Sequence, residues 1–295
     1  MKLFSSGEKL KPFWVFKSPD GFKIWKIFPT RYDKVLCELR NLEGKNVKFV
    51  CLSTENGKKV WEDLNIDEPW WVQISDSDED LFFLCEFRRP DFPVQGKIYA
   101  VDSNSGKILW ENEEHTFLFA LDGKVYTAKN FIEKRIFFEL DSKTGEVIRE
   151  HGENVDFINE LKEFKSESMN FIETSLPFDE YHPGYDKIVE DIKPFIEDAD
   201  PRFPPEVLTK GNFAIVNYHI LNKSKLPLEI EKFSNILKII NIEQKSLIYE
   251  DILYRDLSYF LPDVFFCKGD LVFYVKNQTE LVTIKLPQVY ESHYG

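Results

Sequence analysis

The chain has 295 residues, of which 43% are hydrophobic and 15% aromatic, enough to form one large domain or two ordinary ones. Its 51 acidic and 38 basic residues give a formal net charge of −13, which repels phosphate backbones and anionic membrane surfaces. The charge therefore excludes nucleic acid and membranes from the partners that we expect.

The N-terminal segment, MKLFSSGEKLKPFWVF, has no apolar run of signal-peptide length, and no part of the sequence approaches the roughly 18–20 apolar residues of a membrane span. From this pattern we expect a cytoplasmic protein. The cysteines lie inside apolar runs without CxxC spacing, which predicts buried free thiols; they are Cys37, Cys51, Cys85 and Cys267.

The two ends of the chain are predicted to pair with each other. Residues 12–17 (PFWVFK) and 22–28 (FKIWKIF) have the pattern of strands separated by a turn, and 280–288 (ELVTIKLPQ) forms the last strand. No outer strand follows 280–288, so we predict that 12–17 completes its sheet. The alternative places 13–25 in the register of the hairpins described next, as part of an extra unit. The two alternatives predict different partners for Trp14.

A short pattern of apolar strand, polar turn and returning strand recurs in the chain. In the copy KIYAVDSNSGKILW, Asp102 can accept hydrogen bonds from backbone N–H groups of the turn, and Gly106 supplies a positive φ. The pattern predicts a β-hairpin with a tight loop. Its copies stand at residues 49–61, 97–110, 137–149 and 237–249.

The copies keep the same kinds of residue at the same spacing. Asp141 and Gly145 form the turn of the third copy, and Asn241 and Lys245 that of the fourth. Each copy ends in a large side chain suited to packing against a neighbouring sheet; these are Trp61, Trp110, Arg149 and Tyr249.

Another strand precedes each hairpin, and a further apolar stretch often precedes that strand, as at 69–75 and 116–121. The repeating unit is thus a four-stranded antiparallel meander, and units recurring at roughly 40–50 residues are typical of a β-propeller. We predict an all-β propeller of five or six blades in a single domain over 1–295; the alternative is an open sandwich of unrelated hairpins. The second strands are predicted at 33–41, 79–87, 122–130, 211–221 and 269–277.

These repeats resemble the pyrroloquinoline-quinone-type propeller repeat, whose pattern is roughly DGxVYxx…xLYALDxxTGxxxW. The best match is 122–149 (DGKVYTAKNFIEKRIFFELDSKTGEVIR), followed by 97–110, and the resemblance covers most of 20–150 and 209–286. It implies a propeller of a kind found in quinoprotein dehydrogenases and in cofactor-free scaffolds. The dehydrogenases usually carry eight blades and adjacent cysteines. This chain is too short for eight blades and has no adjacent cysteines, so we expect no quinone cofactor.

Residues 151–208 break the repeat. Within them, 184–199 (GYDKIVEDIKPFIEDA) has a helical apolar pattern that Pro194 can kink or end, and 157–164 also fits a helix. We predict a partly helical insertion here; a degenerate sixth blade is the alternative. An insertion of this size either forms part of a site or serves as structural cover.

Motifs for catalysis and metal binding are absent from the sequence, which has no HExxH, GxSxG or GxxxxGK[ST] pattern. One cluster, PFDEYHPGYDKIVED, brings Asp179, Tyr181, His182 and Tyr185 together. A histidine flanked by carboxylates is suited to ligand binding or base catalysis, but the same residues fit an ordinary turn that opens a helix.

Arg88 and Arg89 lie on a loop between two predicted strands. There they could bind an anion or simply offset neighbouring acids.

Two functions follow from these patterns. The first is a non-catalytic cytoplasmic propeller that binds an unknown protein partner or acts as a scaffold, because the architectural pattern is rich and the catalytic one is missing. The second is a small-ligand-binding protein or enzyme whose site lies at the central channel, capped by the 151–208 insertion, with His182 and Tyr181 or Tyr185 in the site.

Overall fold

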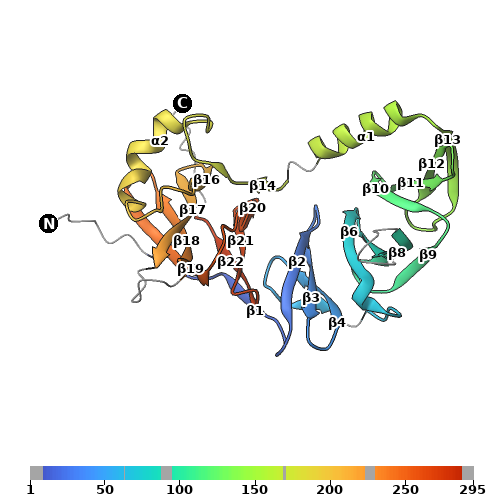
Figure 1. Cartoon of the computed structure of the whole chain (residues 1–295), viewed down its shortest axis with the longest axis horizontal. Coiled ribbons are helices and arrows are strands. Elements are labelled where there is room, and N and C mark those ends of the chain that lie inside the picture. Colours follow the sequence, from blue (N-terminus) through green and yellow to red (C-terminus); the bar gives the residue numbers. More distant parts are fainter. Residues whose placement is uncertain (1–8, 63, 88–94, 169–170, 223–229, 288–295) are drawn as a thin grey trace, which may run out of the picture. The chain divides into compact units, whose positions relative to one another are not determined.

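The computed structural model describes residues 9–62, 64–87, 95–168, 171–222 and 230–287 (Figure 1). The chain divides into two compact units: an N-terminal unit, Ser18–Phe171, and a C-terminal unit, Ile172–Gly295 together with Met1–Lys17. Strands make up 54% of the structure and helices 10%, as the sequence predicts for a mostly β protein. No helix in the described ranges is both long enough and apolar enough to cross a membrane. A single domain over 1–295 stays a prediction.

The described part of the N-terminal unit contains three four-stranded antiparallel sheets, and in each sheet consecutive strands are neighbours. This confirms the predicted meander. The first sheet consists of β2 (Lys23–Pro29), β3 (Lys34–Asn41), β4 (Asn46–Ser53) and β5 (Lys59–Trp61). The second consists of β6 (Val72–Asp78), β7 (Leu81–Phe87), β8 (Gln95–Asp102) and β9 (Ile108–Asn112). The third consists of β10 (Thr116–Leu121), β11 (Lys124–Asn130), β12 (Arg135–Asp141) and β13 (Val147–Gly152).

The predicted turn chemistry is present in the hairpins. The Asp102 carboxylate accepts hydrogen bonds from the backbone N–H groups of Asn104 and Ser105, at 2.7 and 2.8 Å. Asp141 accepts the equivalent bonds from Thr144 and Lys143, at 2.8 and 2.9 Å. These bonds, the Thr144 bond foremost, hold the pKa of the Asp141 carboxyl below its usual range because they stabilise the charged form.

The tryptophan that ends one hairpin packs on the turn of the next hairpin along the chain. Trp61 donates from its indole Nε1 to the carbonyl of Ser103 at 2.8 Å, and Trp110 donates to the carbonyl of Ser142 at 2.8 Å. A Cβ added to Gly106 would lie 2.7 Å from the Trp61 ring. The turn glycines Gly106 and Gly145 therefore supply a positive φ and also leave the space that the indole of the preceding hairpin occupies.

Apolar side chains fill the spaces between consecutive sheets of this unit. Leu36 and Phe49 of the first sheet cluster with Ile74 and Phe82 of the second. A separate cluster joins the second sheet to the third, through Phe83, Cys85, Ile98, Phe117, Val125 and Leu140. Each sheet is thus covered by its neighbour, and each fully buried Phe or Leu contributes roughly 1.5–3 kcal/mol.

The C-terminal unit contains, in its described residues, two five-stranded antiparallel sheets. One has the order β15 (Leu176–Pro177), β16 (Glu206–Lys210), β17 (Phe213–Asn222), β18 (Lys232–Asn241) and β19 (Ser246–Leu257). The other has the order β1 (Trp14–Lys17), β22 (Glu280–Lys285), β21 (Leu271–Lys276), β20 (Phe265–Lys268) and β14 (Glu173–Thr174).

Strand β1 pairs with β22, with Trp14 opposite Thr283, as predicted for residues 12–17. The Trp14 ring also meets Phe273 of β21 edge to face at 5.9 Å. The alternative register for 13–25 is not adopted, because β2 pairs with β3 instead.

Residues 151–208 contain the two helices of the described chain, α1 (Val155–Ser168) and α2 (Tyr185–Ile192). Both were predicted, although α1 extends beyond 157–164 and α2 stops short of Pro194, which lies in a short 3₁₀ helix at Lys193–Phe195. The segment also supplies β14 and β15, which add outer strands to the two sheets of the C-terminal unit.

The four cysteines are buried and none forms a disulfide, as predicted. Burial raises the pKa of the Cys51, Cys85 and Cys267 thiols to about 12, and it raises that of Cys37 as well. They pack as small apolar side chains and stay protonated at neutral pH.

Candidate ligand-binding site

The residues singled out in the sequence around His182 form the turn before α2. The His182 ring is buried, lies 3.3 Å from the carbonyl of Val207 through Nε2, and meets Phe178 edge to face. Tyr185 packs on the same Phe178 ring, whereas Tyr181 is 84% exposed. The Asp179 carboxylate accepts a bond from the backbone N–H of Tyr181. This geometry is that of a turn opening a helix, and a ligand-binding role for these residues stays a prediction.

Arg88 and Arg89, the predicted anion-binding pair, lie outside the described residues.

A cavity of about 110 Å³ lies instead within the N-terminal unit. Its position follows from the repeat, because it is bordered by the turns that come after the first strand of each sheet. Those turns are at 30–33, 79–80 and 122–123. Ten residues line it: Arg31, Tyr32, Ser77, Asp78, Glu79, Ala120, Leu121, Asp122, Lys165 and Phe171.

An irregularity in β6 directs polar side chains toward this cavity. The register between β6 and β7 shifts between Ile74 and Asp76, and such a bulge re-aims the side chains that follow it. Asp76 and Ser77 come directly after the shift and are only 5% and 9% exposed. The first strands of the other two sheets, β2 and β10, carry register shifts as well.

Helix α1 closes one side of the cavity. Phe157, Ile158 and Leu161 on one face of α1 pack against the third sheet. Lys165 follows one turn later on the same face and ion-pairs with the Asp76 carboxylate; its Nζ also donates to the Ala120 carbonyl at 2.6 Å. The helix comes from the predicted insertion, and Lys165 joins it to the first strands of two sheets, β6 and β10.

Asp78 is the partly buried carboxylate of the cavity. Its Oδ2 accepts a hydrogen bond from the backbone N–H of Gly123 at 2.7 Å. Burial raises the pKa of the Asp78 carboxyl, although the Gly123 N–H and the charge of Lys165 act in the opposite direction. The charged form is therefore incompletely compensated by the protein around it, which is a mark of binding and catalytic carboxyl groups.

Ser77 presents a hydroxyl to the cavity. The residue is only 9% exposed, and its backbone N–H donates to the Asp76 carboxylate at 2.8 Å. A hydroxyl at this place can donate one hydrogen bond to a bound group and accept others from it.

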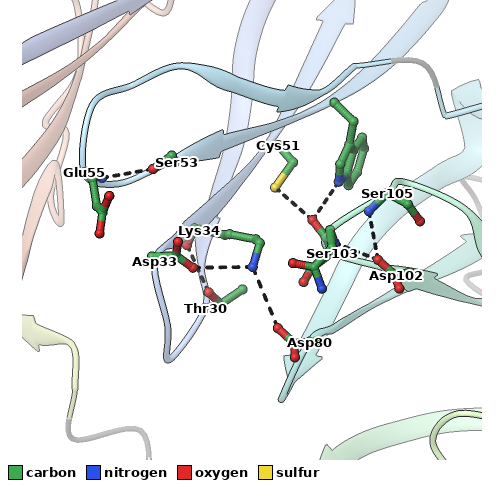
Figure 2. Close-up of polar contacts among 12 residues, drawn as sticks. Thr30, Asp33, Lys34, Cys51, Ser53, Glu55, Asp80, Asp102, Ser103 and Ser105 are labelled. Carbon is green, nitrogen blue, oxygen red and sulfur yellow. Dashed lines mark hydrogen bonds and ion pairs between the residues drawn. The ribbon is translucent and has the colours of Figure 1, made fainter.

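Next to the cavity, polar contacts connect the first sheet to the second (Figure 2). Lys34, 8% exposed, lies with its Nζ 3.4 Å from Asp33 and 3.7 Å from Asp80. Ser103 donates from its backbone N–H to the Asp80 carbonyl at 2.8 Å. Its own carbonyl lies 3.6 Å from the Cys51 Sγ. These contacts fix the turn at 30–33, which supplies Arg31 and Tyr32 to the cavity.

The sequence did contain a signal for this site. In ISDSDED (74–80), Asp76 and Asp78 alternate in a strand whose counterparts in the other sheets are apolar, such as FLFAL at 117–121. Carboxylates in a first strand indicate a polar site rather than a core. Lys165 gave no such signal, because it stands among other charged residues of an ordinary helix.

No group of three or more His, Cys, Asp or Glu side chains in the described ranges is arranged to hold a metal ion.

A family model described as a domain of unknown function (DUF4905) matches residues 29–110, less than a third of the chain. The matched segment holds half of the cavity lining, from Arg31 to Glu79. No curated protein matches the chain.

Among solved structures, the β-propeller domain of the trilobed protease from Pyrococcus furiosus is 13% identical, with a TM-score of 0.30; the match covers 87% of this chain and 65% of that one. The Dos1 propeller is 10% identical, with a TM-score of 0.28 and coverage of 91% and 56%. An acylaminoacyl peptidase from Pyrococcus horikoshii is 12% identical, with a TM-score of 0.29 and coverage of 86% and 36%. The chain thus spans less than two thirds of each of these proteins.

Proposed function

We propose that this protein is a binding protein that holds a small polar ligand in the cavity beneath α1. The observation that supports this most directly is the Asp78 carboxylate, which lines the cavity, has its pKa raised by burial and keeps acceptor sites beyond its backbone hydrogen bonds. Ser77, only 9% exposed, lines the same cavity. A partly buried carboxylate with acceptor sites to spare, beside a hydroxyl in a cavity, is an arrangement that a small polar ligand can complete.

The test is saturation-transfer NMR with three probes of equal size: propylammonium, 1-propanol and acetate. We expect at least one to bind the wild-type protein. Ser77→Leu should abolish that signal because its side chain fills the cavity, whereas Ser166→Leu, on the exposed face of α1, should preserve it. Failure of every probe, or an unchanged signal with a folded Ser77→Leu variant, would overturn the proposal.

A protein-binding role for the same scaffold is the second candidate function. The outer strand β13 favours it, because Val147 and Ile148 are 52% and 54% exposed there. Val147→Thr with Ile148→Thr would abolish capture of a partner while leaving probe binding at the cavity intact. A captured partner that tolerates both substitutions would exclude this strand as the interface.

We further propose that the five sheets are the blades of one propeller, closed by the pairing of β1 with β22, and that the protein is cytoplasmic. The docking of Trp61 and Trp110 on successive turns supports blades of the quinoprotein type. A closed ring requires both units to unfold in one cooperative transition, and two separate transitions would contradict it.

A further inference from the structure

We propose that the ligand of this cavity is a small organic cation, with an ammonium or guanidinium head on a short tail. The inference rests on the proposed function, because it names the class of ligand that the same cavity takes.

The charges at the cavity favour a cation. Asp78, Glu79 and Asp122 line it together with Arg31 and Lys165. The charge of Lys165 is engaged by buried Asp76, and exposed Lys143 lies 3.9 Å from Glu79. With these two partners included, the side chains at the cavity carry one more negative charge than positive ones. The whole protein has a formal net charge of −13, so the wider field has the same sign. Such a field attracts cations and repels anions.

The hydrogen-bonding groups favour a donor. Asp78 accepts hydrogen bonds from the backbone N–H groups of Gly123 and Asp122, although a carboxylate has sites for about four, and the Ser77 hydroxyl at the cavity can accept as well. An ammonium group offers three N–H donors and no acceptor. A cation here would also stabilise the charged form of Asp78, whose pKa burial raises.

The apolar part of the lining suits an organic cation. Tyr32 and Phe171 border the cavity, and aromatic rings attract ammonium and guanidinium groups while they also pack against methylene groups. A volume of about 110 Å³ equals the space of roughly three to four water molecules in the liquid. The cavity therefore accepts a head group and a tail of a few carbons.

The experiment compares propylammonium, 1-propanol and acetate by the same saturation-transfer NMR titration. We expect propylammonium to bind with a Kd in the millimolar range, as is normal for so small a ligand, and acetate not to bind. Asp78→Asn should weaken propylammonium binding about tenfold or more. Asp122→Asn, at an exposed turn position with φ 49° that asparagine tolerates, should weaken it severalfold without affecting folding.

The matched control is Glu150→Gln, which removes one negative charge from exposed β13 and should change the Kd less than twofold. Binding of acetate or 1-propanol in preference to propylammonium would overturn this inference but leave the proposed function standing. Failure of all three probes would overturn both. Displacement of propylammonium by micromolar Mg²⁺ would also overturn it, because the carboxylates would then belong to a metal site.

Discussion

At the scale of single residues, the contact of an indole with a glycine turn decides how consecutive sheets pack. Gly106 has φ 71°, and a Cβ there would lie 2.7 Å from the Trp61 ring. Gly106→Ala should therefore destabilise the N-terminal unit by about 2–4 kcal/mol, combining backbone strain with displacement of the indole. Urea unfolding followed by tryptophan fluorescence measures this loss, and the emission should shift as the indole moves.

Gly152→Ala separates the two contributions. Gly152 also has a positive φ, 62°, but no atom lies within 4 Å of the position where its Cβ would stand. Its substitution should cost only the strain of a left-handed backbone, about 1–2 kcal/mol. Equal losses in the two variants would show that the contact with Trp61 contributes nothing.

These residues also show what the sequence could predict. The turn acid, the turn glycine and the closing tryptophan act within a dozen residues of one another, so their spacing in the sequence already specifies the hairpin. The cavity differs, because Ser77 and Lys165 are brought together only by the packing of α1 on the third sheet. The residues around His182 form the turn that opens α2, and their ligand-binding role stays a prediction.

At the scale of elements, Lys165 is the polar contact that fixes α1 over β6 and β10. Lys165→Met removes the ion-pair partner of the Asp76 carboxylate, which is only 5% exposed and would keep just its hydrogen bonds from the backbone N–H groups of Ser77 and Ala120. Because an unpaired buried charge is costly, we expect a loss of roughly 3 kcal/mol. Amide hydrogen exchange should accelerate in the last turns of α1 and at Ala120.

Two variants make this expectation specific. Lys162→Met removes an exposed lysine from the same helix and should change stability by less than about 0.5 kcal/mol. Adding Asp76→Asn to Lys165→Met neutralises the stranded carboxylate and should recover part of the loss. No recovery would mean that Lys165 contributes through packing of its aliphatic chain rather than its charge.

At the scale of the whole molecule, a buried histidine with a lowered pKa lies in the described part of each unit. His115 lies against Phe138 in the N-terminal unit with its Nδ1 2.7 Å from the Thr127 Oγ1. His219 lies between Phe203 and Phe260 in the C-terminal unit. Burial lowers the pKa of both to about 4, because an imidazolium is poorly solvated there.

Stability should therefore fall on mild acidification. Between about pH 6.5 and 4 the unfolded chain binds protons at these histidines and the folded chain does not, so lowering the pH favours unfolding. At pH 5 each histidine should cost on the order of 1–2 kcal/mol relative to pH 7.5. Urea unfolding at the two pH values measures the difference, and His115→Gln and His219→Gln should each remove its own share. If the ring is closed, both histidines lower the free energy of unfolding of one common transition. If the units unfold separately, each histidine lowers the stability of its own unit only. If the double variant loses as much stability on acidification as the wild type, the acid sensitivity comes from other groups.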